Sequence, residues 1–231
     1  MAMIGTRSAW SGNMGRFLYV LAIMVHAFAV FGQVTQPPVI YNGHAYPVVL
    51  IGDQWWFAEN LRTERYRNGD TIPSLPQAKD WRYTRTGSQA VYRSDTAMLA
   101  VHGRLYNWYA VTDPRGLCPL GWRVPTAADW EALALALGGD SIAGGALKDT
   151  LHWKGPNTGA TNATGFSGRP GGARSNHGEY LFEGAYGYYW SSTPDGPDKV
   201  VFRFLGTYNA DLYRNSSEPQ DGFSCRCVRV E

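Results

Sequence analysis

The sequence predicts a single domain of short helices, strands and long loops, preceded by an export signal. The 231 residues are 44% hydrophobic, which is enough for one substantial core. Charged residues make up only 17%, while the chain holds 27 glycines and 9 tryptophans, a balance typical of a loop-rich fold with aromatic packing. Helix and strand signals are both present and are separated by polar, glycine-rich segments.

Residues 1–33 have the pattern of a signal peptide. Arg7 and Arg16 precede an apolar run over 17–31, and small residues at its end predict cleavage there. A membrane anchor is the alternative, but the run is slightly short for a spanning helix. We therefore expect an exported protein in the periplasm, at the cell surface or secreted, with no membrane span after cleavage.

The domain itself is expected over residues 47–231, after an extended, proline-containing linker at 34–46. Two apolar runs at 48–51 and 54–57 flank a short Gly-Asp turn, which is a β-hairpin signal. Residues 62–100 are polar and contain several prolines and arginines, so they predict mostly irregular surface.

The clearest helix signal begins at Thr126. Its hydroxyl can accept from the exposed amides of the first turn, and Asp129 occupies the third helical position, where a carboxylate meets the same amides. Trp130, Leu133 and Leu137 then recur at helical spacing until a Gly-Gly pair releases the backbone. Weaker signals predict short helices near 75–81 and at 105–111, and another helical turn or two over 142–151. Three closing strands are predicted at 186–190, 200–205 and 223–230.

Export makes the three cysteines candidates for disulfide pairing, because the compartment is oxidising. A bridge between Cys225 and Cys227 would close a strained and very small ring, since side chains two apart in a strand lie too far from each other. We therefore expect a disulfide between Cys118 and Cys227, with Cys225 left over.

Six separated motifs follow one another along the chain: WFAENL at 56–61, GRLYNW at 103–108, CPLGWRVPT at 118–126, GFSGRPGG at 165–172, YWSST at 189–193 and GFSCRCV at 222–228. Together they resemble the Fibrobacter succinogenes major paralogous domain, a family common in exported proteins of Bacteroidetes and Fibrobacteres and largely without assigned activity. Cys225 departs from the family pattern, which has an apolar residue before the arginine. That departure leaves the choice of Cys225 or Cys227 as the partner of Cys118 open.

The sequence of that family is in turn similar to the C-type lectin-like fold, which includes the formylglycine-generating enzymes. The resemblance therefore implies an α+β fold of the C-type lectin-like kind. It would have two main short helices, a small twisted antiparallel sheet and long structured loops.

The expected function is that of a non-catalytic binding module for an extracellular glycan or protein. The segment 207–217 is rich in side chains that make adaptable contacts at low ordering cost. In lectin-like folds the corresponding late loops carry ligand contacts, so the resemblance favours a site here, although an ordinary polar strand and turn is the alternative. The expected ligand-binding residues are Tyr208, Asn209, Asp211, Tyr213, Arg214 and Asn215.

Other classes of function have weaker support. A net charge of +2 without a run of lysines or arginines gives no basis for binding nucleic acid. A formylglycine-generating-like oxidase, or its remnant, would need a pair of thiols for copper, and the expected disulfide leaves only Cys225. A structural envelope or filament subunit is the remaining alternative.

No metal or cofactor site is clearly predicted. His102, His152 and His177 lie in unrelated segments, which argues against a histidine site. Four carboxylates gather loosely in the C-terminal loops, where calcium could bind through oxygen ligands, but they lack a regular ligand pattern and solvated loop acids are the alternative. These carboxylates are Asp195, Asp198, Asp211 and Asp221.

Three polar motif residues are interpreted as structural. Glu59, Asn60 and Arg123 are expected to belong to a buried hydrogen-bonded network that holds the core, and not to a binding site.

Overall fold

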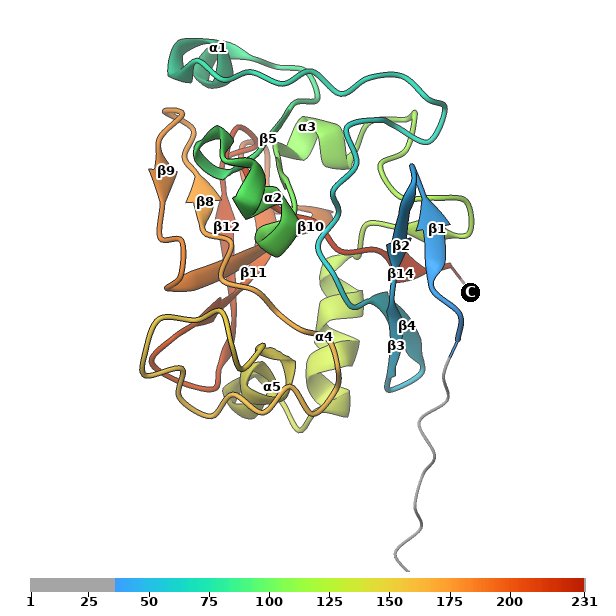
Figure 1. Ribbon diagram of the computed structural model, residues 1–231, viewed down its shortest axis with the longest axis vertical. Coiled ribbons are helices and arrows are strands. Elements are labelled where there is room, and N and C mark those ends of the chain that lie inside the picture. The colour runs from blue at the N-terminus through green and yellow to red at the C-terminus, as the bar shows by residue number, and fades with distance from the viewer. Residues whose placement is uncertain (1–35, 231) are drawn as a thin grey trace, which may run out of the picture. The chain divides into compact units, whose positions relative to one another are not determined.

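The computed structural model describes residues 36–230, which form four β-sheets and five short α-helices (Figure 1). The predicted signal peptide over residues 1–33 lies outside the described residues. The expected α+β, C-type lectin-like class is wrong, because the described residues are mostly β and their strands fall into several sheets. No helix within the described range is long and apolar enough to cross a membrane.

The largest sheet has six strands, and its long strands pair antiparallel, β10 with β11 and β11 with β12. Side chains alternate between the two faces of a strand, so Tyr189, Leu205 and Leu212 lie on one face while Phe204 and Tyr213 lie on the other. The strands, in spatial order, are β12 (Leu212–Ser217), β11 (Val200–Gly206), β10 (Tyr186–Pro194), β13 (Phe223–Ser224), β6 (Leu105–Tyr106) and β5 (Gln89–Ala90).

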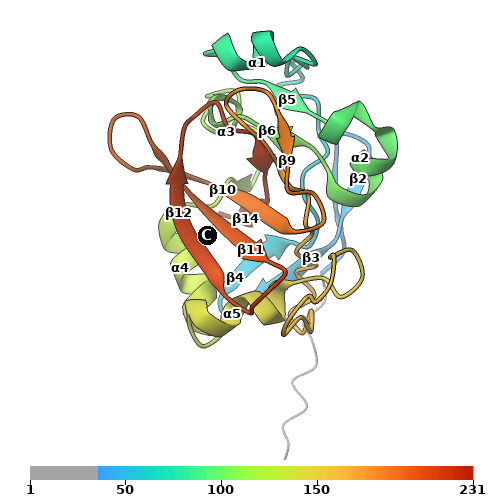
Figure 2. The ribbon, with the colours of Figure 1, turned by 90° about the vertical axis from the view of Figure 1, so that its left-hand side faces the viewer.

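Two helices cover one face of this sheet, α4 (Ala127–Ala136) and α5 (Asp140–Leu147). The predicted start of α4 is confirmed: Thr126 is the N-cap, and it forms a reciprocal capping box with Asp129. The buried Trp130 packs with the sheet residues of this face in one core cluster. Figure 2 shows β10, β11 and β12 in front of α4 and α5, so the opposite face of these strands is turned away from both helices.

The second sheet brings the start and the end of the domain together. The predicted hairpin is confirmed as the antiparallel pair of β3 and β4, and β14 lies between β4 and β7. A disulfide joins Cys118 to Cys227, as predicted, and ties the segment before β7 to the segment before β14. The strands are β3 (Val48–Ile51), β4 (Gln54–Phe57), β14 (Val228–Arg229) and β7 (Trp122–Arg123).

The expected linker over 34–46 is partly ordered structure. β1 (Val39–Tyr41) and β2 (His44–Tyr46) form a hairpin, and Tyr41 and Tyr46 are buried in the main core. Each strand has only three residues, which is too short for an alternating pattern to reveal. The remaining elements are α1 (Ala78–Tyr83), a 3-10 turn (Tyr92–Ser94), α2 (Thr96–His102), α3 (Trp108–Val111), β8 (Ala173–Arg174) and β9 (Tyr180–Leu181).

The strand expected over 223–230 is split, because β13 and β14 belong to different sheets and Arg226 lies between them. The Arg226 side chain is fully buried. It donates to the side-chain oxygen of Asn60 at 2.6 Å and to the carbonyl oxygens of Phe57, Phe166 and Ser167 at 2.6–2.9 Å. The guanidinium also lies 4.2 Å from the centre of the Phe166 ring. One side chain therefore links the two sheets to the 165–172 loop.

The structural interpretation of the polar motif residues is confirmed for Asn60, whose amide also donates to the carbonyl oxygen of His102 and to the Ser224 hydroxyl. Glu59 and Arg123 are not part of this network. Glu59 is partly exposed and pairs with Arg62 and His44, and Arg123 pairs with Asp129 of the capping box.

We predict that Arg226→Met strongly destabilises the domain. The change leaves buried carbonyl oxygens without donors, so the free energy of unfolding should fall by about 3–5 kcal/mol. Urea denaturation of the full chain would measure this loss. The matched control is Arg229→Met, three positions along and exposed, which should stay within about 0.5 kcal/mol of the parent. Equal stability of the two variants would contradict the role given to Arg226.

We also predict one titratable thiol that reacts only after unfolding. Cys225 is fully buried, and burial raises the pKa of its thiol well above the usual value. A thiol reagent should modify no cysteine in native protein, and one in denaturant without reductant. On non-reducing gels the chain should run as a monomer, and a dimer sensitive to reductant would contradict the burial of Cys225.

Candidate functional site

The open face of β10–β12 carries a set of aromatic side chains. We call it the aromatic face and define it as Phe182, Tyr186, Tyr188, Phe204 and Tyr213. Phe182 is 53% exposed, and the other four are partly exposed. None of the five carries a charge at neutral pH, and burial raises the pKa of Tyr188 further above its usual range.

The rings of the aromatic face pack against one another and leave outer surfaces open. Phe204 and Tyr213 are stacked, with ring centres 4.6 Å apart and an angle of 14° between the planes. Tyr188 lies 5.7 Å from Phe204 and 5.9 Å from Tyr186, each at an angle close to 30°. Phe182 contacts Tyr186 edge-on. The set is therefore a continuous surface built across three strands and the segment before β10.

Buried rings on the same side of the sheet support the aromatic face. Tyr188 stacks on Phe223 at 5.1 Å, and Phe223 packs against Trp190 and Phe202. The Trp190 indole donates to the carbonyl oxygen of Tyr106 at 2.7 Å, which satisfies its buried N–H. Because the supporting rings belong to the core, the outer rings have little freedom to rearrange.

The structure brings three of the predicted ligand-binding residues together. The Asn209 amide donates to the Tyr213 hydroxyl, and a hydrogen bond with Asp211 raises the pKa of Tyr213. Tyr208, in the turn between β11 and β12, is 70% exposed. The turn and the edge of the aromatic face thus form one surface.

The other two predicted residues separate onto opposite faces of β12. Asn215 lies on the same face as Tyr213, because the two are two positions apart in the strand. Arg214 lies on the face that packs against α4 and α5, and it pairs with Asp195 at 3.6 Å. Arg214 therefore does not share a surface with the aromatic face.

A buried lysine holds the turn in place. Lys148 follows α5, and its ammonium group donates to the carbonyl oxygens of Thr158, Gly206 and Asn209 at 2.7–3.1 Å. Burial lowers the pKa of Lys148 to about 8, so the group remains mainly protonated at neutral pH and keeps three donors for three acceptors. Gly144 lets α5 approach the turn closely, because a Cβ at this position would lie only 2.3 Å from the carbonyl oxygen of Asp211.

The sequence analysis missed most of the aromatic face and missed Lys148. A signal for the aromatic face was present, because Tyr186 and Tyr188, like Phe202 and Phe204, alternate within strands that were predicted. Which face of the sheet the helices cover is set by long-range pairing, and no local pattern gives it. Lys148 offered no signal, because its acceptors are backbone carbonyls that any residue supplies.

A separate polar cluster joins two of the histidines. Asp149, with 8% of its side chain exposed, accepts from the Arg169 Nε at 3.0 Å and from His152, and Arg169 also reaches the second ring nitrogen of His152. His102 lies 3.4 Å from Glu183. Burial lowers the pKa of His102, Arg169 and His152 add to the effect, and Glu183 opposes it. Segments that the sequence left unrelated therefore meet here.

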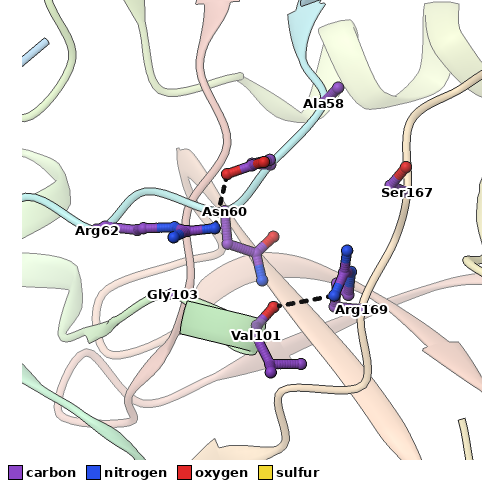
Figure 3. Close-up of a pocket in the computed structure, with 8 residues that line it drawn as sticks. Ala58, Asn60, Arg62, Val101, Gly103, Ser167 and Arg169 are labelled. Carbon is purple, nitrogen blue, oxygen red and sulfur yellow. Dashed lines mark hydrogen bonds and ion pairs between the residues drawn. The ribbon is translucent and has the colours of Figure 1, made fainter. Parts of the chain in front are cut away.

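The cavity beside this cluster is too small for a ligand. It has a volume of about 10 Å³, which is room for about one water molecule. Figure 3 shows Asn60, Arg62 and Arg169 around it, with Arg169 linked to the carbonyl of Val101. These contacts give the cluster a role in joining loops.

The four C-terminal carboxylates named for calcium have separate partners in the fold. Asp195 pairs with Arg214, Asp211 bonds to Tyr213, and Asp221 accepts from the backbone of Asn176 and from a serine hydroxyl, while Asp198 is exposed. Within residues 36–230, no group of three His, Cys, Asp or Glu side chains is arranged to hold a metal ion.

We predict that Lys148→Met loosens the turn that flanks the aromatic face. Methionine keeps the apolar stem but leaves three carbonyl oxygens without a donor, so stability should fall by about 2–4 kcal/mol. Hydrogen exchange should accelerate at residues 206–211 before it does so in β4. Lys154→Met is the control, because Lys154 is 67% exposed, and its stability should change by less than about 1 kcal/mol. Unchanged exchange in Lys148→Met would contradict the anchoring role.

The comparisons with known proteins identify the family. No curated protein matches the chain, and no solved structure does. Residues 49–229, which include every strand from β4 to β14, match the Fibrobacter succinogenes major domain. The chain therefore belongs to the Fibrobacter succinogenes major domain family.

Proposed function

We propose that this protein is an exported, non-catalytic binding module that recognises a neutral glycan through the aromatic face and the adjoining turn at 207–211. The observation that carries the proposal is the continuous, partly exposed and uncharged set of rings on the face of β10–β12 opposite α4 and α5. Aromatic rings that gather on one face of a folded domain and keep part of their surface exposed are typical of a binding site.

The chemistry of the surface favours a sugar. Aromatic rings pack well against the apolar faces of pyranose rings, and tyrosine adds a hydroxyl at the edge of the contact. The amides of Asn209 and Asn215 lie beside the rings and supply donors and acceptors for sugar hydroxyls. The absence of charge among the five defining residues favours a neutral chain over an acidic or basic partner.

The binding surface is held in place before any ligand arrives. Lys148 fixes the turn from below, and the backbone of Thr207 bonds to Thr158 and Ala185 on either side. A fixed surface loses little conformational entropy on binding, which improves affinity for a weakly interacting ligand such as a sugar.

The alternatives have less support from the contacts. An oxidase of the formylglycine-generating kind would need an accessible pair of thiols, whereas Cys118 is bridged and Cys225 is buried. A filament subunit would need an open strand edge. Edge strand β12 carries the exposed Arg214, and Asn215 accepts the hydrogen bond of the Ser216 N–H, which makes that edge less suited to pairing.

Export is proposed from the disulfide and from the leader-like sequence. A bridge between Cys118 and Cys227 persists in oxidising compartments, which include the periplasm, the cell surface and the exterior.

A glycan array and a pull-down from envelope extract, each with and without calcium, test this function with the full chain. We expect specific binding of a neutral oligosaccharide that weakens about tenfold or more in Tyr208→Ala/Tyr213→Ala, because two stacking rings are lost. The control is Leu135→Ala, which removes a similarly exposed apolar side chain outside both the aromatic face and the second hollow described below, and should bind like the parent.

Three results would count against the proposal. One is that no glycan binds to folded protein. Another is that binding survives in the double variant. The third is that the variant loses only an envelope protein from the pull-down, which would make the ligand a protein.

A further inference from the structure

A second hollow lies outside the aromatic face and shares no residue with it. It has a volume of about 290 Å³, at the lower end of the range of roughly 300–1,000 Å³ for small-molecule sites, so it fits one sugar-sized group. One wall is the end of α1 and the residues after it, and the other is formed by two turns. The lining residues are Arg82, Tyr83, Arg85, Asn176, His177, Glu218 and Gln220.

The buried side chain of Arg174 holds the two walls together. Its guanidinium donates to the carbonyl oxygens of Leu75 and Pro76 before α1, at 2.6 and 3.1 Å, and to that of Gly178 in the β8–β9 turn at 3.2 Å. It also lies 4.4 Å from the centre of the Trp81 ring in α1. The hollow is therefore formed by the fold and does not depend on a ligand.

Asn176 joins the two turns of the second wall. Its backbone N–H donates to Asp221 at 2.6 Å, and its side-chain amide donates to Glu218. That hydrogen bond lowers the pKa of Glu218, and Lys199 lies 3.5 Å from the other carboxylate oxygen. Glu218 is thus ionised, and its charge is balanced by Lys199.

The two arginines of the first wall have no such balance. Neither Arg82 nor Arg85 forms an ion pair with a carboxylate in the described part of the chain. Arg82 lies 5.5 Å from the centre of the Tyr83 ring. Arg85 donates to the carbonyl oxygens of Arg82 and Thr84 and to the side-chain oxygen of Gln220, all of them uncharged acceptors. Tyr83 is 64% exposed beside them. The hollow therefore presents an open aromatic ring next to two uncompensated positive charges.

We propose that this hollow binds a carboxylate-bearing sugar residue of the uronic acid type. A guanidinium group matches a carboxylate in shape and charge and can hold it with two parallel hydrogen bonds. The Tyr83 ring offers a surface for the face of the sugar, and His177 lines the same hollow and can hydrogen-bond to sugar hydroxyls.

The form of the hollow disfavours an acidic peptide. Extended peptides bind along open strand edges or long grooves. This hollow is bounded by the end of a short helix and two turns, and none of its lining residues belongs to a strand.

Titration calorimetry of the full chain with tri-galacturonate and tri-glucuronate tests the proposal. We expect binding of at least one of them, weakened about tenfold in Arg82→Gln because a charge-assisted pair is lost. Binding should also weaken as salt rises. The same trisaccharides with every carboxyl group reduced to an alcohol should not bind.

Two control variants separate this site from other effects. Arg93→Gln, an exposed arginine in the 3-10 turn, should keep the parent affinity. Tyr208→Ala/Tyr213→Ala should also keep it, so a failure of neutral-glycan binding at the aromatic face is distinguishable from a failure here.

Several results would overturn the proposal. These are no uronate binding by the parent, equal binding by Arg82→Gln, full competition by an equal concentration of inorganic sulfate, and tighter binding of tri-glutamate.

Discussion

The fold depends on the burial of one positive charge. Arg226 lies between β13 and β14, which belong to different sheets. Burying a guanidinium group without hydrogen-bond acceptors would cost more free energy than a domain can offset. Its acceptors are oxygens of Phe57 at the end of β4, of Asn60 shortly after it, and of Phe166 and Ser167 in the distant 165–172 loop. Burial lowers the pKa of Arg226 to about 10, yet the charge is retained at neutral pH. The position of each contributing segment is therefore set by the requirement to satisfy this group.

The same solution recurs around the domain. Lys148 holds the turn next to the aromatic face, and Arg174 holds the walls of the charged hollow. In each case a fully buried cation is satisfied mainly by backbone carbonyl oxygens and not by a carboxylate. Long loops that lack regular hydrogen-bonding partners are thereby fixed, and the two candidate binding surfaces lie on the segments that these cations anchor.

Local signals in the sequence predicted what is locally determined. The capping box at Thr126 and the hairpin at 48–57 follow from short-range chemistry and are present. For the disulfide, local geometry excluded only a Cys225–Cys227 bridge, and the fold selects Cys227 as the partner of Cys118 across 109 positions. The fold class was wrong, because strands of two or three residues carry no periodicity and their sheets are assembled by long-range pairing. For the candidate site, Asn209 and Tyr213 were anticipated from composition, whereas the aromatic face required knowledge of which side of the sheet the helices cover.

Anchoring through carbonyl oxygens has a consequence for how this scaffold can change. Every amino acid supplies a backbone carbonyl, so the acceptors of Lys148 at positions 158, 206 and 209 survive replacement of the side chains there. Side chains of the turn beside the aromatic face can therefore be replaced while Lys148 still holds the backbone of the turn in the same position. A domain organised in this way separates the residues that maintain the position of this turn from those whose side chains the turn displays.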